Sequence, residues 1–162
     1  MKGTVRVLLV GAAAGYAAGQ VMDKATTWVY ARQSDASKRR ENELLPEGAP
    51  IASARKLTSW LGIEPTEDQT GTIAATMHQS LGQLYGVVAA SMTRRGTNPV
   101  AAGLASGAGG FLLVDELANS LFFTPPPQAY PVESHLRGIV GHLTFGATLG
   151  VLLAVARRLR LL

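Results

Sequence analysis

Four long stretches of the chain contain no Asp, Glu, Lys or Arg: residues 7–22, 73–93, 96–114 and 138–156. They are 16, 21, 19 and 19 residues long, and a helix needs about 20 mostly apolar residues to cross the hydrocarbon core of a bilayer. A soluble helical bundle would instead carry charges every three or four residues on one face of each helix. The pattern therefore favours an all-α protein, a bundle of four transmembrane helices, over a soluble bundle.

Local signals set the ends of these helices. The first helix is expected to continue through Trp28 and Tyr30, aromatic residues that suit a membrane interface. The second begins at the capping-box sequence TEDQ of residues 66–69, and the third ends at the three prolines of residues 125–127. We place the spans at residues 4–24, 72–93, 98–123 and 136–156, within one integral membrane domain of residues 1–162.

The first connection, residues 32–69, is the polar part of the chain. Its charged run SDASKRRENE is typical of a solvated helix end or a linker. The following sequence PIASARKLTSWLG places Ala54, Leu57 and Leu61 on one helical face, with two basic residues opposite. We therefore expect a short amphipathic helix in this loop, lying on the membrane surface or against the bundle.

Basic residues close to the span ends indicate the orientation in the membrane. In a four-span arrangement one side receives Lys2, Arg6, Arg94, Arg95, Arg157, Arg158 and Arg160. The other side receives Arg137 and the first loop, in which acids outnumber bases. We expect a bacterial inner (plasma) membrane protein with both termini in the cytoplasm, and a first helix that is retained rather than removed as a signal peptide.

Glycine recurs at every fourth position in each expected span. A glycine inside a helix costs about 1 kcal/mol relative to alanine in water, but small residues four apart let two helix backbones approach closely in a bilayer. We expect these stripes, a glycine-zipper pattern, to pack helices within the chain, against a second copy or against partner membrane subunits. The glycines are Gly11, Gly15, Gly19, Gly82, Gly86, Gly103, Gly107, Gly146 and Gly150.

A few ionisable or polar side chains lie in or beside the spans, where they are costly and so are functional candidates. They are His78 and Tyr85 in the second span, Asp115, Glu116 and Asn119 in the third, and His135 and His142 at the fourth. Asp23 and Lys24 end the first span. Because consecutive helices are antiparallel, all of these residues are expected at the membrane side that bears the long first loop.

Three interpretations of this polar layer stay open. It could be a hydrogen-bonded layer that fixes helix register, with histidines paired to the acids of the third span and Asp23 paired to Lys24. It could be a working site in which His78, His142 and a carboxylate bind a divalent metal, or in which histidines transfer protons near neutral pH. It could also lie at the membrane surface with ordinary solvation.

The two adjacent acids of the third span are expected to differ in direction. Neighbouring side chains on an α-helix point about 100° apart, so only one of Asp115 and Glu116 can point straight at the histidines. We expect Glu116 to face the bundle, with Asn119 one turn beyond it.

The sequence excludes several kinds of chemistry. The chain has no cysteine, which rules out disulfides, thiolate catalysis and cysteine-bound metals. It contains no GxSxG or HExxH motif and no phosphate-binding loop. Its basic residues flank the spans and form no basic and aromatic surface for nucleic acid. The sequence requires no cofactor.

Three stretches resemble a known family: HQSLGQLYG, DELANSLFFTPPPQAYP and HLRGIVGHLTFG, within residues 69–150. They resemble uncharacterised bacterial integral membrane proteins related to the YagU-like inner-membrane family. The resemblance implies a small multi-span protein of unassigned biochemistry and supplies no catalytic residue. We expect a non-enzymatic accessory or assembly component of a membrane complex; the alternatives are a metal- or proton-handling protein and, less favoured, a membrane enzyme acting on lipid.

Overall fold

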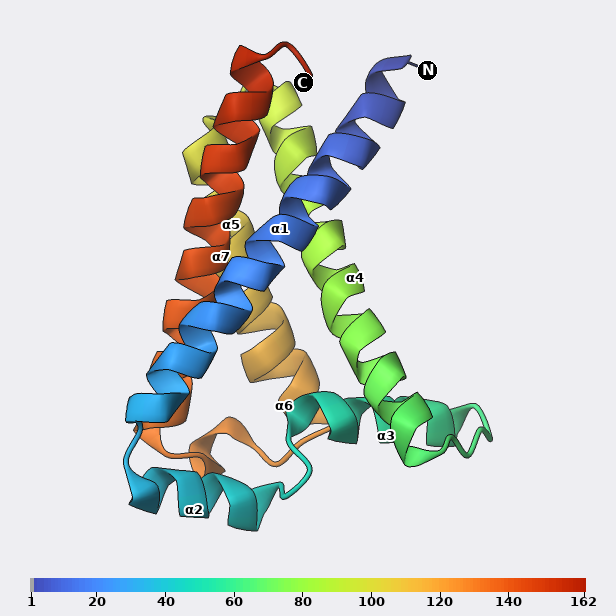
Figure 1. The fold of residues 1–162 in the computed structure, drawn as a ribbon, viewed down its shortest axis with the longest axis vertical. Helices are drawn as coiled ribbons and strands as arrows, with labels where there is room; N and C mark the ends of the chain where they lie inside the picture. The colour runs from blue at the N-terminus through green and yellow to red at the C-terminus, as the bar shows by residue number, and fades with distance from the viewer. Residues whose placement is uncertain (1) are drawn as a thin grey trace.

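The computed structural model describes residues 2–162, with side chains from residue 3 onward. Four long helical segments run alternately down and up: α1 (Lys2–Arg32), α4 (Glu67–Arg94), the continuous run of α5 (Pro99–Gly110), η1 (Phe111–Ala118) and α6 (Asn119–Phe122), and α7 (Val132–Arg158). Two shorter helices, α2 (Asp35–Leu44) and α3 (Ala49–Trp60), lie across one end, near the turn η2 (Pro127–Ala129) (Figure 1). The described residues form helices and turns without a strand, so the all-α class is confirmed.

Three helices are long and apolar enough to cross a membrane: Gly3–Arg32, Pro99–Phe122 and Val132–Arg158. This composition indicates a membrane protein. The expected second span, residues 72–93, lies in α4, which is 28 residues long but is not among the three. The physical reason is its content of Thr, Gln, Ser and Gly, which lowers the mean hydropathy although charges are absent. The expected count of four spans is therefore not shown.

The helix ends follow the local signals. α1 extends past Trp28 and Tyr30. At the start of α4 the capping box is complete: Thr66 Oγ1 accepts a hydrogen bond from the Gln69 N–H at 3.3 Å, and Gln69 Oε1 accepts one from the Thr66 N–H at 2.9 Å. At the start of α5, Asn98 Oδ1 accepts hydrogen bonds from the N–H groups of Val100 and Ala101, at 2.9 and 3.2 Å. These caps satisfy backbone donors that have no partner inside the helix.

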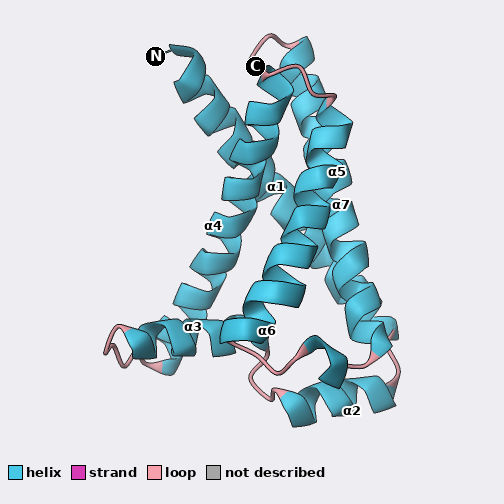
Figure 2. Ribbon diagram, turned by 180° about the vertical axis from the view of Figure 1, so that it is seen from behind, coloured by secondary structure: helices cyan, strands magenta, loops and turns pink. Residues whose placement is uncertain are grey.

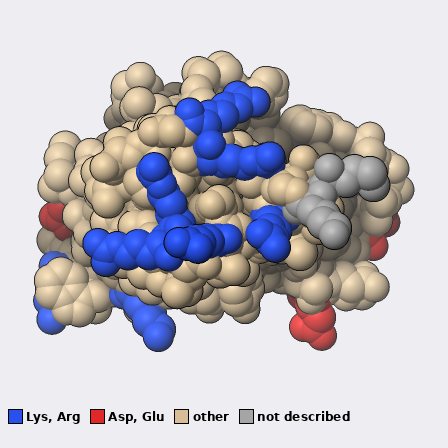
Figure 3. All heavy atoms as spheres, turned by 90° about the horizontal axis from the view of Figure 1, so that it is seen from above, with Lys and Arg blue, Asp and Glu red and all other residues tan. Residues whose placement is uncertain are grey.

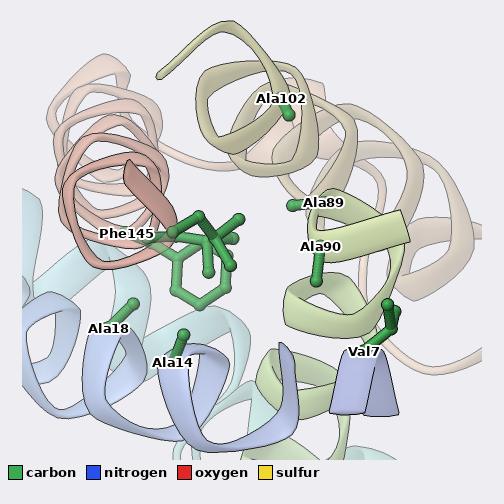
Figure 4. Close-up of a cluster of buried hydrophobic side chains, with 9 residues drawn as sticks. Val7, Ala14, Ala18, Ala89, Ala90, Ala102 and Phe145 are labelled. Atoms are coloured by element: carbon green, nitrogen blue, oxygen red, sulfur yellow. The ribbon is translucent and has the colours of Figure 1, made fainter. Parts of the chain in front are cut away.

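α4, α5 and α7 are close together at the end that holds both termini and spread apart toward α2 and α3, whereas α1 crosses α4 and its N-terminal end points away from them (Figures 1 and 2). α1 packs against both α4 and α7, and α5 packs mainly against α7. Figure 4 shows the centre of this packing, where alanines of α1, α4 and α5 surround Phe145 of α7. Small residues dominate the core because the backbones lie so close to one another.

Glycines form the crossing of α1 and α4. A Cβ at Gly15 would overlap the carbonyl oxygen of Gly82, and a Cβ at Gly86 would overlap that of Gly11. A Cβ at Gly11 would lie 2.6 Å from the Cα of Val87, which is closer than atoms can approach without a shift. The two helix backbones are therefore in direct contact at this crossing.

A second set of glycines forms the contact between α5 and α7. A Cβ at Gly103 would overlap the carbonyl oxygen of Gly146, one at Gly107 would overlap that of His142, and one at Gly150 would lie 2.8 Å from the Cα of Val100. Gly19 differs from the other expected glycines, since its nearest neighbour is Gln79 Oε1 at 3.9 Å. Apart from Gly19, the expected glycine faces are thus occupied by neighbouring helices of the same chain.

The first loop is more structured than expected. The run SDASKRRENE, expected to be a solvated helix end or a linker, forms a helix of its own, α2, in which Ser37 is buried and most of the charged side chains are exposed. The amphipathic helix exists as α3, but its buried face includes Ala54 and Thr58, while Leu61 is 66% exposed. The expectation for Leu61 is wrong because the helix ends at Trp60 and its packing against α4 uses small residues.

Basic side chains gather at the end of the molecule that carries both termini (Figure 3). Arg94 lies over the start of α1, since a Cβ at Gly3 would be 2.7 Å from its guanidinium. The side chain of Lys2, one of the residues used for the expected orientation, lies outside the described part. The others at the helix ends here are Arg6, Arg94, Arg95, Arg157, Arg158 and Arg160.

Candidate functional site

A cavity of about 1000 Å³ lies where the helices spread apart. Residues from α1, α4, α5, η1 and α7 form its walls, and the connection between α2 and α3 borders it at the end of the bundle. The structure brings all seven polar candidates together around this cavity: His78, Tyr85, Asp115, Glu116, Asn119, His135 and His142. The remaining walls are mostly aliphatic and aromatic, as in many sites for small molecules.

The His135 ring lies between Glu116 and the turn that precedes α7. His135 Nε2 lies 3.0 Å from the carbonyl oxygen of Pro127, and His135 Nδ1 lies 2.8 Å from Glu116 Oε1. Both distances are within hydrogen-bonding range. Both ring nitrogens of His135 thus have a partner, and the ring joins α7 to η1 and η2.

His142 and Asp115 are neighbours without a hydrogen bond. His142 Nδ1 donates to the carbonyl oxygen of Gly138 at 3.0 Å, and Asp115 Oδ2 lies 3.6 Å from the same nitrogen, beyond hydrogen-bonding distance. The structure therefore gives Asp115 an imidazole at ion-pair distance, and no hydrogen-bond donor from the side chains that it describes.

The acid that pairs with His78 lies on a different helix than expected. Its Nε2 lies 3.0 Å from Asp23 Oδ1 of α1, so Asp23 pairs with His78 and not with Lys24. The physical reason is position on the helix: Lys24 is rotated about 100° from Asp23 and points to the exposed side of α1. The expected pairing of every histidine with the acids of the third span is also incorrect for His78.

Both acids of the third long segment reach the cavity because the helix there is not an α-helix. Residues 111–118 form a π-helix, in which the Asn119 N–H donates to the carbonyl oxygen of Val114, five residues back. A π-helix has more residues per turn than an α-helix, so adjacent side chains diverge by a smaller angle. The expectation that only Glu116 would face the bundle is therefore wrong, since Asp115 lines the cavity too.

Sequence reasoning missed a polar network that joins α2 to α7. Arg137 Nη2 donates to Glu41 Oε2 at 2.8 Å, and Arg137 Nη1 donates to Gln33 Oε1 at 2.7 Å. Ser134 Oγ donates to Glu41 Oε1 at 2.5 Å, and the Gln33 amide contacts the same carboxylate. Arg137 had been expected only as a charge that sets orientation, and no spacing in the sequence points from it to Glu41.

This network sets the protonation of Glu41, which lies outside the three candidate spans. Burial alone would raise the pKa of the Glu41 carboxyl. Hydrogen bonds from Arg137, Ser134 and Gln33, with the charge of Arg137, outweigh burial and bring the pKa below its usual value. Glu41 is therefore an anion at neutral pH and forms an ion pair with Arg137.

We call residues 33–60, which include α2, α3 and the residues between them, the cover. On one side, Ser34 N–H and Oγ donate to Glu133 of α7 at 2.7 and 2.8 Å, beside the Glu41 network. On the other side, Arg55 bridges Glu47 and Glu67 at 2.6 and 2.7 Å. The cover is thus attached to α7 and to α4, at two sides of the cavity.

The expected metal set does not assemble. Among residues 2–162 no three His, Asp or Glu side chains are grouped so that they could hold a metal ion. His78 is turned toward Asp23, while His142 is turned toward Gly138. The arrangement instead offers isolated histidine–acid neighbours around an apolar cavity.

The chain matches no known protein family, no curated protein and no solved structure. The fold and the site therefore define its class by themselves. It is an all-helical membrane protein with three candidate spans and a cavity lined by histidines and acids at the end opposite its termini.

Proposed function

We propose that this is a small four-span protein of the bacterial inner membrane that catalyses no reaction and serves as an accessory component by holding an apolar small molecule in its cavity. The observation that carries this proposal is the cavity itself. Its volume of about 1000 Å³ is at the upper end of the range for drug-sized ligands. Its walls combine apolar side chains with a few polar groups, which is the usual composition of a small-molecule site.

The packing of α4 supports a fourth span. α4 lies antiparallel to α1 and α5 and contacts both, and residues 73–93 carry no charge. Several of its polar side chains, among them His78 and Tyr85, line the cavity and so need not face lipid. With four spans both termini share one side, and the basic residues gathered there favour the cytoplasm (Figure 3). The resemblance to YagU-like inner-membrane proteins agrees with this arrangement.

Association with a second copy or with partner subunits is a separate part of the proposal. The glycine faces already pack within the chain, so an association would use other surfaces. α7 offers one, since Leu136, Leu143 and Val151 are each about half exposed or more. In a bilayer such side chains can face lipid or another helix equally well.

Native mass spectrometry after purification in mild detergent, without chelator, tests the proposal. We expect a small apolar molecule bound at about one per chain. Ala118 lines the cavity, whereas Ala108 of the same helical segment is exposed and lies off it. Ala118→Phe should therefore release the molecule, and the matched control Ala108→Phe should retain it. Equal occupancy in both variants, or none in the parent, would contradict the proposal.

Proton handling is the second candidate, and the 2.8 Å contact between His135 Nδ1 and Glu116 Oε1 favours it. Glu116→Gln removes the ionisable partner and keeps the hydrogen bond. If the pair carries protons, this variant should abolish the pH change that the parent produces inside liposomes loaded with a pH-sensitive dye. Glu64→Gln, an exposed change away from the cavity, is the control. Parent liposomes that behave like empty ones would eliminate this candidate.

A further inference from the structure

Asp115 is an acid in the cavity wall whose nearest basic neighbour, His142 Nδ1 at 3.6 Å, lies beyond hydrogen-bonding distance. It accepts no hydrogen bond from the described side chains, and 41% of its side chain remains accessible, next to the cavity that it lines. An ionised carboxylate in a membrane interior is costly unless a positive charge lies beside it. The nearest basic nitrogen, His142 Nδ1, already donates to Gly138.

The other titratable groups near Asp115 are hydrogen-bonded to other partners. They are His142, Glu116, His78 and Arg137. The Arg137 guanidinium is bound to Glu41 and Gln33 of the cover. His78 is paired with Asp23, and His135, the remaining histidine of the cavity, is paired with Glu116. His142 is the basic group beside Asp115, at 3.6 Å, and its Nδ1 is hydrogen-bonded to Gly138.

Aromatic rings lie beside the Asp115 carboxylate. A Cβ at Gly138 would lie 2.9 Å from the Phe111 ring and 3.8 Å from Asp115 Oδ2, so both side chains flank the same point of α7. Tyr85 and Phe145 also line the cavity. Aromatic faces attract cations, most strongly where water is excluded.

Two more features indicate that the cavity receives a molecule. At its inner end Ser106 is only 5% exposed, and its hydroxyl has no hydrogen-bond partner among the described residues. On the side, Leu84 of α4 lines the cavity while 58% of it is exposed, which places it at a rim. This rim lies in α4, which packs against α1, α3, α5 and α7. It is the side from which we expect an apolar molecule to enter.

We infer that the molecule held in the cavity is a lipophilic cation, with one positive charge placed beside Asp115 and an apolar body against the aromatic and aliphatic walls. This inference rests on the proposed function and adds the class of ligand. Charge complementarity carries it: the cavity presents a carboxylate that accepts no hydrogen bond, next to aromatic rings, and the basic side chains around it are hydrogen-bonded to other groups.

Equilibrium dialysis of the detergent-solubilised protein with two probes tests the inference. Tetraphenylphosphonium is a lipophilic cation, and triphenylphosphine oxide is a neutral molecule of related shape. We expect the parent protein to bind the cation at least about tenfold more tightly than the neutral probe, since a carboxylate at close range in a poorly solvated site has that effect or more. This comparison needs no variant and so does not depend on the folding of one.

Asp115→Asn should weaken binding of the cation about tenfold and leave binding of the neutral probe unchanged. Asp68→Asn is the matched control, the same change at an exposed position of the first turn of α4, and it should bind like the parent. Equal binding of both probes by parent and Asp115→Asn would overturn the inference but leave the cavity as a binding site. Binding of neither probe would overturn both the inference and the proposed function.

Discussion

The crossing of α1 and α4 makes a quantitative prediction for Gly15→Ala. A Cβ there would overlap the carbonyl oxygen of Gly82 and would also lie 2.9 Å from the carbonyl carbon of Gly82 and 3.0 Å from the Cα of Gln83. All three atoms belong to the backbone of α4. Because a helix backbone cannot rotate aside as a side chain can, the two helices must separate.

The magnitude follows from two opposing terms. Overpacking of a well-packed contact costs about 1–3 kcal/mol, and a backbone neighbour places this case in the upper half of that range. Replacing a glycine inside a helix by alanine stabilises the helix by up to about 1 kcal/mol. We therefore expect Gly15→Ala to lower the free energy of unfolding by about 1–2 kcal/mol.

Gly19→Ala is the matched control in the same helix. Its Cβ would meet nothing closer than Gln79 Oε1 at 3.9 Å, an ordinary contact, so the variant should be neutral or gain up to about 1 kcal/mol. Unfolding by SDS in mixed micelles, followed by far-UV circular dichroism, measures both changes. A Gly15→Ala protein as stable as the parent, or less stable only to the extent that Gly19→Ala is, would refute the direct backbone contact.

Two further predictions concern polar groups. Folding lowers the pKa of the Glu41 carboxyl from its usual value of 4.5, so the Glu41 anion stabilises the fold above that value, and this contribution is lost as the pH falls through the lowered pKa. Thermal unfolding should therefore show a steeper loss of stability below about pH 4.5 in the parent than in Glu41→Gln. Parallel curves for the two proteins would contradict this prediction. Asp23→Asn should weaken the contact with His78 and reduce the free energy of unfolding by about 1 kcal/mol, while Lys24→Gln should have little effect. A larger loss for Lys24→Gln than for Asp23→Asn would favour the Asp23–Lys24 pair expected from the sequence.

The sequence predicts the parts of the fold that depend on local signals. The capping box at Thr66, the prolines after the third segment and the extension of the first helix through Tyr30 all have local causes. The glycine spacing marks the residues that lie at the helix crossings, because only glycine allows such approach. The seven polar candidates share one cavity because antiparallel helices bring their positions to the same level.

The parts that could not be predicted depend on tertiary contacts. A π-helix has no spacing signal of its own, and without it the joint exposure of Asp115 and Glu116 to the cavity cannot be foreseen. The cover was missed because the charges of α2 look like those of any solvated helix until Glu41 meets Arg137. The pairing of His78 with Asp23 required the direction in which α1 crosses α4.

The place of α4 in the membrane is the central claim, since a cavity enclosed by four spans requires that α4 cross the bilayer. The chain has no native cysteine, so single cysteines can report on each side. A membrane-impermeant maleimide added to spheroplasts should label Asn42→Cys in α2, and should label Thr97→Cys, between α4 and α5, only after lysis. Labelling of both positions from the outside, or of both only after lysis, would contradict a four-span protein with its cavity opposite the termini.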